Sequence, residues 1–183
     1  MNFAYVSGSA ALDLAGTLKW RRSEPEELLA GPGDLRRWLD HSARLPSGVA
    51  VDPASFAAAI ALRDAIYQLA TDRLHGRAFE PRSLELVNRT ALGPGLTTQL
   101  THTGAVTAGD IGAVLAEIAR DAVAVLAEPD SPLKECGRPD CTRIYLDRSR
   151  GARRTWCGMQ ECGNRVKAAA YRARKRGDDA GIS

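Results

Sequence analysis

The four cysteines of the chain are the residues whose type and spacing point most directly to chemistry. They form two pairs, Cys136 with Cys141 and Cys157 with Cys162, each with four residues between its members, and fifteen residues separate the pairs. Two close pairs around a short insert are typical of four thiolates that bind one Zn²⁺ at the corners of a tetrahedron, although two residues within each pair is commoner. The three histidines lie far upstream. We therefore expect one structural zinc ion bound by all four cysteines.

Disulfides and buried thiols without a metal are the two alternatives for these cysteines. No segment resembles a signal peptide, so we expect a reducing cytoplasmic environment in which thiols stay free. All four cysteines fall within 27 residues of a 183-residue chain, which disfavours four unrelated buried thiols. A site closed by four cysteines leaves no position for a catalytic water, and no histidine–carboxylate constellation accompanies it. We therefore expect a protein that is not an enzyme.

The segments around the cysteines must position them. Residues 142–146 are predicted to form a strand, 147–151 a turn and 153–156 a returning strand. After the last cysteine, apolar residues recur with helical period at Val166, Ala170 and Ala173. The segment thus predicts a small treble-clef-like finger made of a zinc knuckle, a β-hairpin and a basic helix. A unit of about 40 residues has little core of its own, so the metal would supply much of its stability.

The run Cys162-Gly163-Asn164-Arg165, the paired spacings and the basic residues that follow resemble the CGNR zinc-finger family. In that family the finger follows a ligand-binding-type domain called ABATE, and the pair is regarded as a bacterial transcription regulator. Residues 12–17 and 25–39 are similar to the ABATE region, with Gly16 where family members often carry asparagine. The resemblance implies a cytoplasmic, nucleoid-associated protein of bacterial type.

Charge is concentrated in the predicted finger. Residues 134–176 carry 13 Lys/Arg against 4 Asp/Glu, a net of +9, whereas residues 1–133 have a net of −4 and the tail −2. Such a local excess is typical of a protein that binds a polyanion, and the preponderance of arginine favours nucleic acid. A solvated basic face is the plainer alternative. The candidate nucleic-acid contacts are Arg153 and Arg154 on the hairpin and Arg165, Lys167, Arg172, Arg174, Lys175 and Arg176 on the helix.

The rest of the chain predicts a mostly helical domain. Its expected elements are a short helix within 9–20, with a strand as the alternative for 12–15, a helical turn at 25–31, and helices from Asp34, from Asp52 to near Gly76, at 81–92 and at 111–126. Residues 96–107 predict a β-hairpin. No apolar run is long enough to span a membrane. The fold class is therefore α+β, mostly α, with a helical domain at 1–127, a linker at 128–133, the finger at 134–176 and a tail at 177–183.

Two polar residues interrupt apolar helix faces in this domain. Arg63 lies in the middle of the apolar face of the long helix, and Asn88 lies among the inward positions of the next one. A polar group on a buried face needs a partner. Together with Asp13 and Thr17 upstream, these residues could line a polar pocket for a small anionic ligand. The alternatives are that Arg63 extends to the rim and that Asn88 bonds a backbone carbonyl.

The sequence therefore predicts a transcription regulator that binds DNA through a structural-zinc finger and senses a small ligand through its helical domain. An RNA- or ribosome-associated zinc protein is the alternative, because a zinc knuckle with a basic helix serves either polymer. Regulators that read paired half-sites are often dimers, so a homodimer is open as well.

Overall fold

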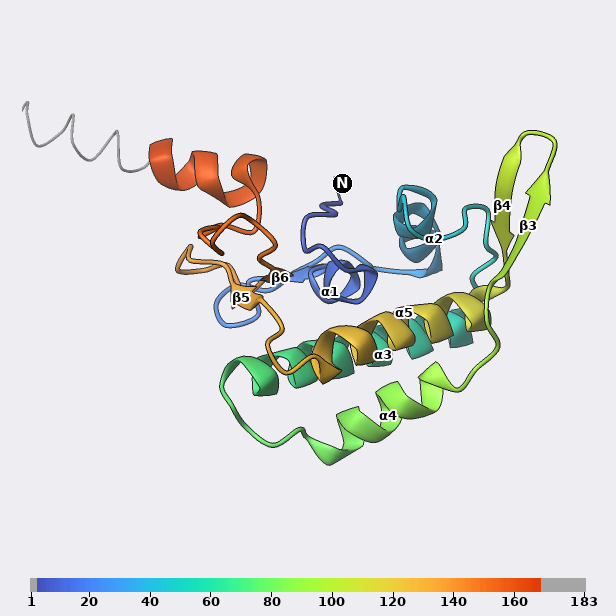
Figure 1. Cartoon of the computed structure of the whole chain (residues 1–183), viewed down its shortest axis with the longest axis horizontal. Coiled ribbons are helices and arrows are strands. Elements are labelled where there is room, and N and C mark those ends of the chain that lie inside the picture. The colour runs from blue at the N-terminus through green and yellow to red at the C-terminus, as the bar shows by residue number, and fades with distance from the viewer. Residues whose placement is uncertain (1–2, 169–183) are drawn as a thin grey trace, which may run out of the picture.

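The computed structural model describes residues 3–168 (Figure 1). In chain order its elements are α1 (Ala10–Ala15), β1 (Leu18–Lys19), β2 (Glu26–Glu27), α2 (Pro32–Asp40), α3 (Pro53–Leu74), α4 (Pro81–Ala91), β3 (Thr97–Thr101), β4 (Gly104–Ala108), α5 (Ile111–Ala127), β5 (Leu133–Glu135), β6 (Ile144–Leu146) and a π-helical turn, η1 (Met159–Gly163). The fold is α+β and mostly helical, as the sequence predicts. No helix in this part of the chain is long and apolar enough to cross a lipid bilayer.

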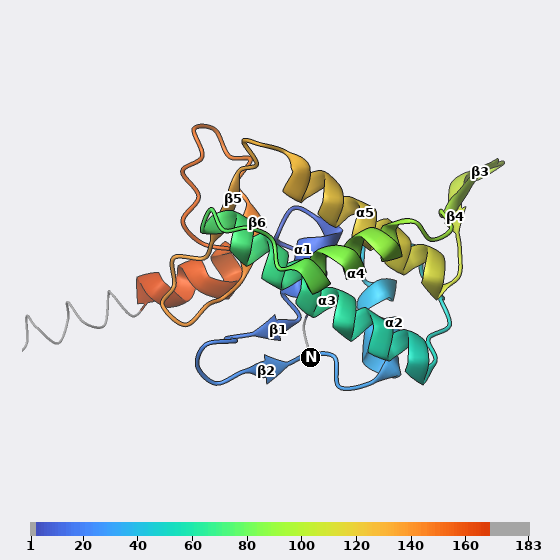
Figure 2. The same ribbon diagram turned by 90° about the horizontal axis from the view of Figure 1, so that it is seen from below.

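The main core lies between α3 and the helices around it. In both views α3 and α5 run side by side, with α4 along them and α1 packed near their finger-facing half (Figures 1 and 2). The ends of α3 and α5 follow from local sequence. Asp52 caps α3 by accepting from Ser55 N at 2.9 Å, with Pro53 in the first turn, and Asp110 caps α5 by accepting from Ala113 N at 2.8 Å. Helix α3 thus begins where Asp52 and Pro53 predict.

The short helix α1 is buried over its whole length. A helix of six residues cannot be stable by propensity alone, so its first turn needs external partners. Asp121 of α5 supplies them: its Oδ2 accepts from Ala11 N at 2.8 Å and from the hydroxyl of Ser9, the N-cap residue, at 2.5 Å. This carboxylate therefore ties the N-terminus of the domain to its last helix.

Two expectations about the segment before α3 are wrong. Residues 25–31 do not form a helical turn; they contain β2, which pairs with β1. Glu27 fixes this extended path, because its carboxylate accepts two bonds from the buried Arg63 at 2.7 Å and one from Leu29 N at 2.8 Å. The next helix begins at Pro32 rather than Asp34.

The predicted hairpin at 96–107 is confirmed as β3 and β4, whose register pairs Thr97 with Ala108 and Thr101 with Gly104. Every residue of the two strands is exposed, and the hairpin projects from the body in both views (Figures 1 and 2). It lies at the end of the molecule opposite the cysteine-containing segment.

Strand β6 does not pair as expected. Its antiparallel partner is β5, upstream of the first cysteine, and not residues 153–156. Leu146 N also donates to Ser7 O at 2.8 Å, so β6 is bonded on both edges. The side chains of Ile144 and Leu146 belong to the main core. The cysteine segment is therefore anchored in the helical body, with a shared core.

We expect Asp121→Ala to lower the free energy of unfolding by about 1–2 kcal/mol, because the first turn of α1 loses its acceptor. Urea unfolding followed by circular dichroism measures this. The control is Glu117→Ala on the same helix, whose exposed pair with Arg120 should contribute less than about 1 kcal/mol. Equal losses in the two variants would show that the α1 cap is not a stabilising contact.

Candidate zinc centre and nucleic-acid surface

The structure brings all four cysteine sulfurs together. Their Sγ atoms lie within 4.8 Å of one another, and all four residues are buried. The Sγ atoms of Cys157 and Cys162 are 3.6 Å apart and those of Cys141 and Cys157 are 3.9 Å apart. A disulfide requires about 2.05 Å, whereas four sulfurs at about 2.3 Å from a tetrahedral zinc lie about 3.8 Å from one another. The geometry fits one structural Zn²⁺ and excludes disulfides, as the spacing predicts.

The first pair of ligands is shaped by backbone hydrogen bonds. Cys136 N donates to Arg143 O at 3.0 Å, which continues the β5–β6 ladder into the knuckle, and Cys141 N donates to Arg138 O at 3.0 Å. Gly137 N donates to Thr155 O at 2.8 Å, so the knuckle is also held against the segment that leads to the second pair. These bonds set the positions of Cys136 and Cys141 without help from side chains.

The second pair sits at a π-helical turn. In η1 the amides of Cys162 and Gly163 both donate to Gly158 O at 3.0 Å. This wide turn carries Cys162 inward while the chain continues as helix over residues 164–168. Cys157 N donates to Cys136 Sγ at 3.4 Å. A backbone donor to sulfur favours the thiolate form that zinc binds.

A small apolar cluster surrounds the sulfurs. Tyr145 is completely buried beside the cysteines, and Val6 and Trp156 pack on the same cluster. The Tyr145 hydroxyl donates to Arg154 O at 2.7 Å. Burial raises the pKa of Tyr145 to about 12, so the ring stays neutral. The cluster shields the site from water on this side.

Arg154 was expected to hold a phosphate, and the structure gives it a different role. Its guanidinium donates to Trp156 O at 2.8 Å, to Val6 O at 2.7 Å and to Cys157 O, and it stacks 4.3 Å from the centre of the Tyr145 ring. Its Nε and Nη2 donors are therefore engaged with backbone carbonyls. The Arg154 guanidinium ties the second cysteine pair to the N-terminal segment at Val6. Sequence spacing could not show this contact.

Hydrogen bonds to the side chain of Asp147, and not pairing with β6, hold residues 153–156 in place. The buried carboxylate of Asp147 accepts from Arg154 N at 3.0 Å, from Lys134 Nζ at 2.7 Å and from the Ser149 hydroxyl at 2.6 Å. Burial opposes ionisation, but these hydrogen bonds outweigh it and hold the pKa of Asp147 well below its ordinary value. This network replaces the predicted returning strand.

Three of the remaining candidate nucleic-acid contacts lie within residues 3–168. Arg153, Arg165 and Lys167 are exposed. No ion pair among residues 3–168 involves any of the three. The other candidates lie outside the described residues, as do two positions of the expected apolar stripe: Arg172, Arg174, Lys175 and Arg176, with Ala170 and Ala173.

The four expected pocket residues are not gathered around one cavity by the contacts they make. Asp13 is buried and accepts from Ser7 N at 2.8 Å, and burial raises the pKa of its carboxyl. Thr17 donates to Leu14 O at 2.7 Å, and Arg63 is buried against Glu27. The inward placement of Asn88 is wrong, because this residue is exposed. Helix α4 is an outer helix in which only Val87 is fully buried, so its polar positions face solvent.

Comparisons with known proteins agree with the architecture. A family model named ABATE, described as "Putative stress-induced transcription regulator", matches residues 8–129, well over half of the chain. A model described as CGNR zinc finger matches residues 133–175. A search of curated proteins finds no match.

We expect one zinc per chain, and removal of the metal should open the finger while leaving α3, α4 and α5 folded. The reason is that Ile144 and Leu146 belong to the helical core, whereas the sulfurs and Tyr145 form a separate cluster. Metal analysis and hydrogen exchange with and without chelator measure this. Less than half an equivalent of zinc in carefully reduced protein, or unchanged protection of 136–162 after chelation, would contradict it.

We expect Arg154→Ala to destabilise the finger by about 2–3 kcal/mol, because three half-buried backbone carbonyls lose a charged donor. The neighbouring Arg153→Ala, which removes an exposed side chain, should change stability by less than about 0.5 kcal/mol. Thermal unfolding and zinc retention measure both. Similar stability of the two variants would show that Arg154 does not brace the site.

Proposed function

The chain belongs to the ABATE family and carries a CGNR zinc finger, and on this basis we propose that it regulates transcription by binding DNA through the finger. The helical part, residues 1–127, would receive the signal, and the finger would contact the nucleic acid. The zinc is structural in this proposal, since four cysteines fill its coordination and leave no site for water.

The observation that carries the proposal is the charge of the finger. Residues 134–176 have a net charge of +9 with the cysteines counted as neutral, against −4 for residues 1–133. Four thiolates with one Zn²⁺ contribute −2, which leaves +7 for the metal-loaded finger. This excess favours the approach of a polyanion to one end of the molecule, and repulsion would keep the acidic helical part away from it.

Only part of this charge is free to meet phosphates. Lys134 is paired with Asp147 at 2.7 Å, and the guanidinium of Arg154 is engaged with backbone carbonyls. Arg153 and Lys167 are exposed. Arg165 is exposed too and directly follows the last ligand and Asn164, so the metal fixes its backbone. We therefore assign phosphate contacts to Arg153 and Lys167, and base or phosphate contact in a groove to Arg165.

The geometry of the finger supports a helix as the reading element. Residues 164–168 are helical and continue η1, and in Figure 1 this helix lies on the side of the finger that faces away from α3 and α5. A helix in such a position is accessible to the major groove of a duplex. In the sequence after this helix, residues 172–176 add four more cationic side chains.

We expect Arg153→Ala and Lys167→Ala each to weaken binding to any duplex DNA and to lower the slope of log K against log salt by about one unit, because each removes one phosphate contact. Fluorescence anisotropy across a salt series measures this. Arg36→Ala, which removes an exposed arginine from α2 in the acidic part, is the control and should leave the slope unchanged.

The same titrations with duplex RNA of matched sequence separate the two polymers. Tighter binding to RNA at every salt concentration would favour the RNA-associated alternative. If neither finger variant differs from the wild type at low salt, the DNA-binding proposal is wrong.

A further inference from the structure

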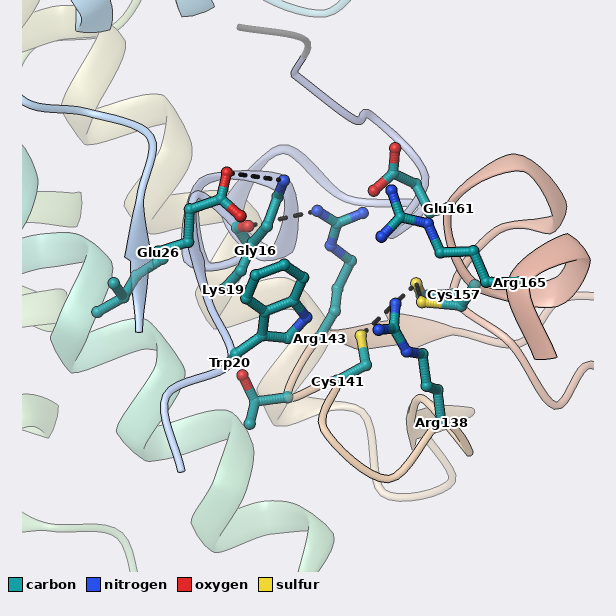
Figure 3. A pocket seen from close by; sticks show the side chains of 13 residues that line it. Gly16, Lys19, Trp20, Glu26, Arg138, Cys141, Arg143, Cys157, Glu161 and Arg165 are labelled. Carbon is teal, nitrogen blue, oxygen red and sulfur yellow. Dashed lines mark hydrogen bonds and ion pairs between the residues drawn. The ribbon is translucent and has the colours of Figure 1, made fainter. Parts of the chain in front are cut away.

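A cavity of about 150 Å³ lies where the helical part meets the finger (Figure 3). One side is formed by the end of α1 and the β1–β2 hairpin, and the other by the knuckle, η1 and the two residues before β6. The residues that matter here are Gly16, Trp20, Arg138, Arg143, Glu161 and Arg165. Any molecule bound in this cavity would touch both parts of the protein.

Arg143 is the unusual residue of this wall. It is only 6% exposed, and its guanidinium makes one long bond, from Nη2 to Gly16 O at 3.4 Å. Its Nη1 is buried and has no hydrogen-bond partner among residues 3–168. Arginine keeps its charge in proteins, and a buried charge is costly unless it is paired. The charge of Arg143 acts on the buried Asp13 carboxyl and lowers its pKa against the larger effect of burial, but no hydrogen bond joins the two residues within the described chain. Arg143 therefore brings to the cavity wall a cation whose hydrogen bonding is incomplete.

Gly16 makes this arrangement possible. A Cβ at this position would lie 2.9 Å from Arg143 Nε, so any side chain here would displace the guanidinium. The backbone of Gly16 has ordinary right-handed angles, and the glycine is therefore required by space and not by conformation. The close approach of Gly16 to Arg143 thus lets the end of α1 pack directly against the finger.

Two more guanidiniums converge on the same cavity. Figure 3 shows Arg138 and Arg165 on either side of the space that Arg143 closes. Neither makes an ion pair or a side-chain hydrogen bond within residues 3–168, and Arg138 lies 5.8 Å from the centre of the Trp20 ring. Of the two carboxylates in the wall, Glu26 is paired with Lys19 at 3.5 Å, which leaves Glu161 to face three arginines.

The zinc centre is the competing explanation for these arginines. Three of its cysteines border the cavity, and four thiolates with one Zn²⁺ carry a net charge of −2 that nearby cations would balance. None of the hydrogen bonds to the cysteine sulfurs within residues 3–168, however, comes from an arginine. The guanidiniums of Arg138 and Arg165 line the cavity and make no side-chain hydrogen bond within residues 3–168, so they can bind a further group.

We propose that this cavity binds a small molecule through a carboxylate or phosphate group, with Arg143 at its floor and Arg138 and Arg165 at its sides. The guanidinium fork matches either oxyanion with paired donors. A volume of about 150 Å³ accommodates a molecule of about the size of benzene. Trp20 offers the ligand an apolar face. The buried position of Arg143 favours a small ligand over the phosphate of a duplex, which could not enter the cavity.

The consequence for regulation rests on the proposed function. A ligand in the cavity would engage Arg165, which the proposed function assigns to DNA, and so would change the affinity of the finger for DNA. By linkage, DNA would change the affinity for the ligand by the same factor.

The test uses the full, zinc-loaded chain and two probes, inorganic phosphate and benzoate. Titration calorimetry and Trp20 fluorescence should show saturable binding of at least one probe below roughly 10 mM, where a built site exceeds nonspecific association. Arg143→Gln should weaken that binding at least tenfold while zinc content stays at one per chain. Arg150→Gln, on an exposed arginine of the finger outside the cavity, should leave it within twofold. Trp20→Phe should remove the fluorescence change but not the heat.

Arg138→Gln provides a second variant at the side of the cavity if Arg143→Gln does not fold, and the same loss is expected. Absence of saturable binding of both probes to the wild type would overturn the inference. So would loss of zinc in Arg143→Gln without any probe binding, since the arginines would then only balance the thiolates. A loss of duplex DNA binding in Arg143→Gln without any probe present, equal to its loss of probe binding, would assign the cavity to nucleic acid and overturn the inference. DNA binding without probe binding refutes this site alone, and probe binding without DNA binding refutes the proposed function alone.

Discussion

Strand β6 is the element on which the arrangement of the whole molecule depends, because it is buried on both faces. Side chains alternate along a strand, so Ile144 and Leu146 enter the core of the helical part while Tyr145, between them, enters the cluster of cysteines. Three residues thus connect two cores of different chemistry. A rotation of the finger would require these residues to leave one core or the other. The finger is therefore positioned by packing, and the zinc fixes only its internal shape.

Hydrogen bonds between the finger and the N-terminal segment supplement this packing. Leu146 N bonds Ser7 O, Arg154 reaches Val6 O, and Arg143 reaches Gly16 O, so three contacts tie the finger to residues before or at the end of α1. That N-terminal segment is in turn held to α5 by Asp121. The residues around α1 therefore form the surface against which residues 143–154 of the finger are held.

Much of this was accessible from sequence where the signal is local. Four cysteines with short spacings predict their own site, and Asp52 with Pro53 predicts the start of α3, because ligand spacing and capping depend on neighbouring residues. The partner of β6 and the role of Arg154 were missed, because both depend on residues far along the chain. Asn88 was misplaced since a helical period shows which residues share a face but not how much of that face is covered. Nothing in the sequence marked Arg143 as a binding residue, because it is one of several residues in the strand predicted at 142–146. Its incomplete hydrogen bonding among residues 3–168 follows from the packing of α1 against the finger.

The arginines of the finger also show why composition alone overstates a binding surface. A guanidinium can brace carbonyls, as in Arg154, remain buried with a donor to spare, as in Arg143, or stay exposed, as in Arg153. Net charge counts the three equally, although only the last is free to release counterions from a duplex. The buried one has a different consequence. Folding has already removed water from the guanidinium of Arg143, so the free energy of desolvating this cation belongs to folding. An oxyanion that binds there gains the attraction of the ion pair without a further desolvation penalty for the cation. A cavity that holds such a residue beside Arg165 is therefore where a small ligand would have the greatest effect on the charge that the finger presents to DNA.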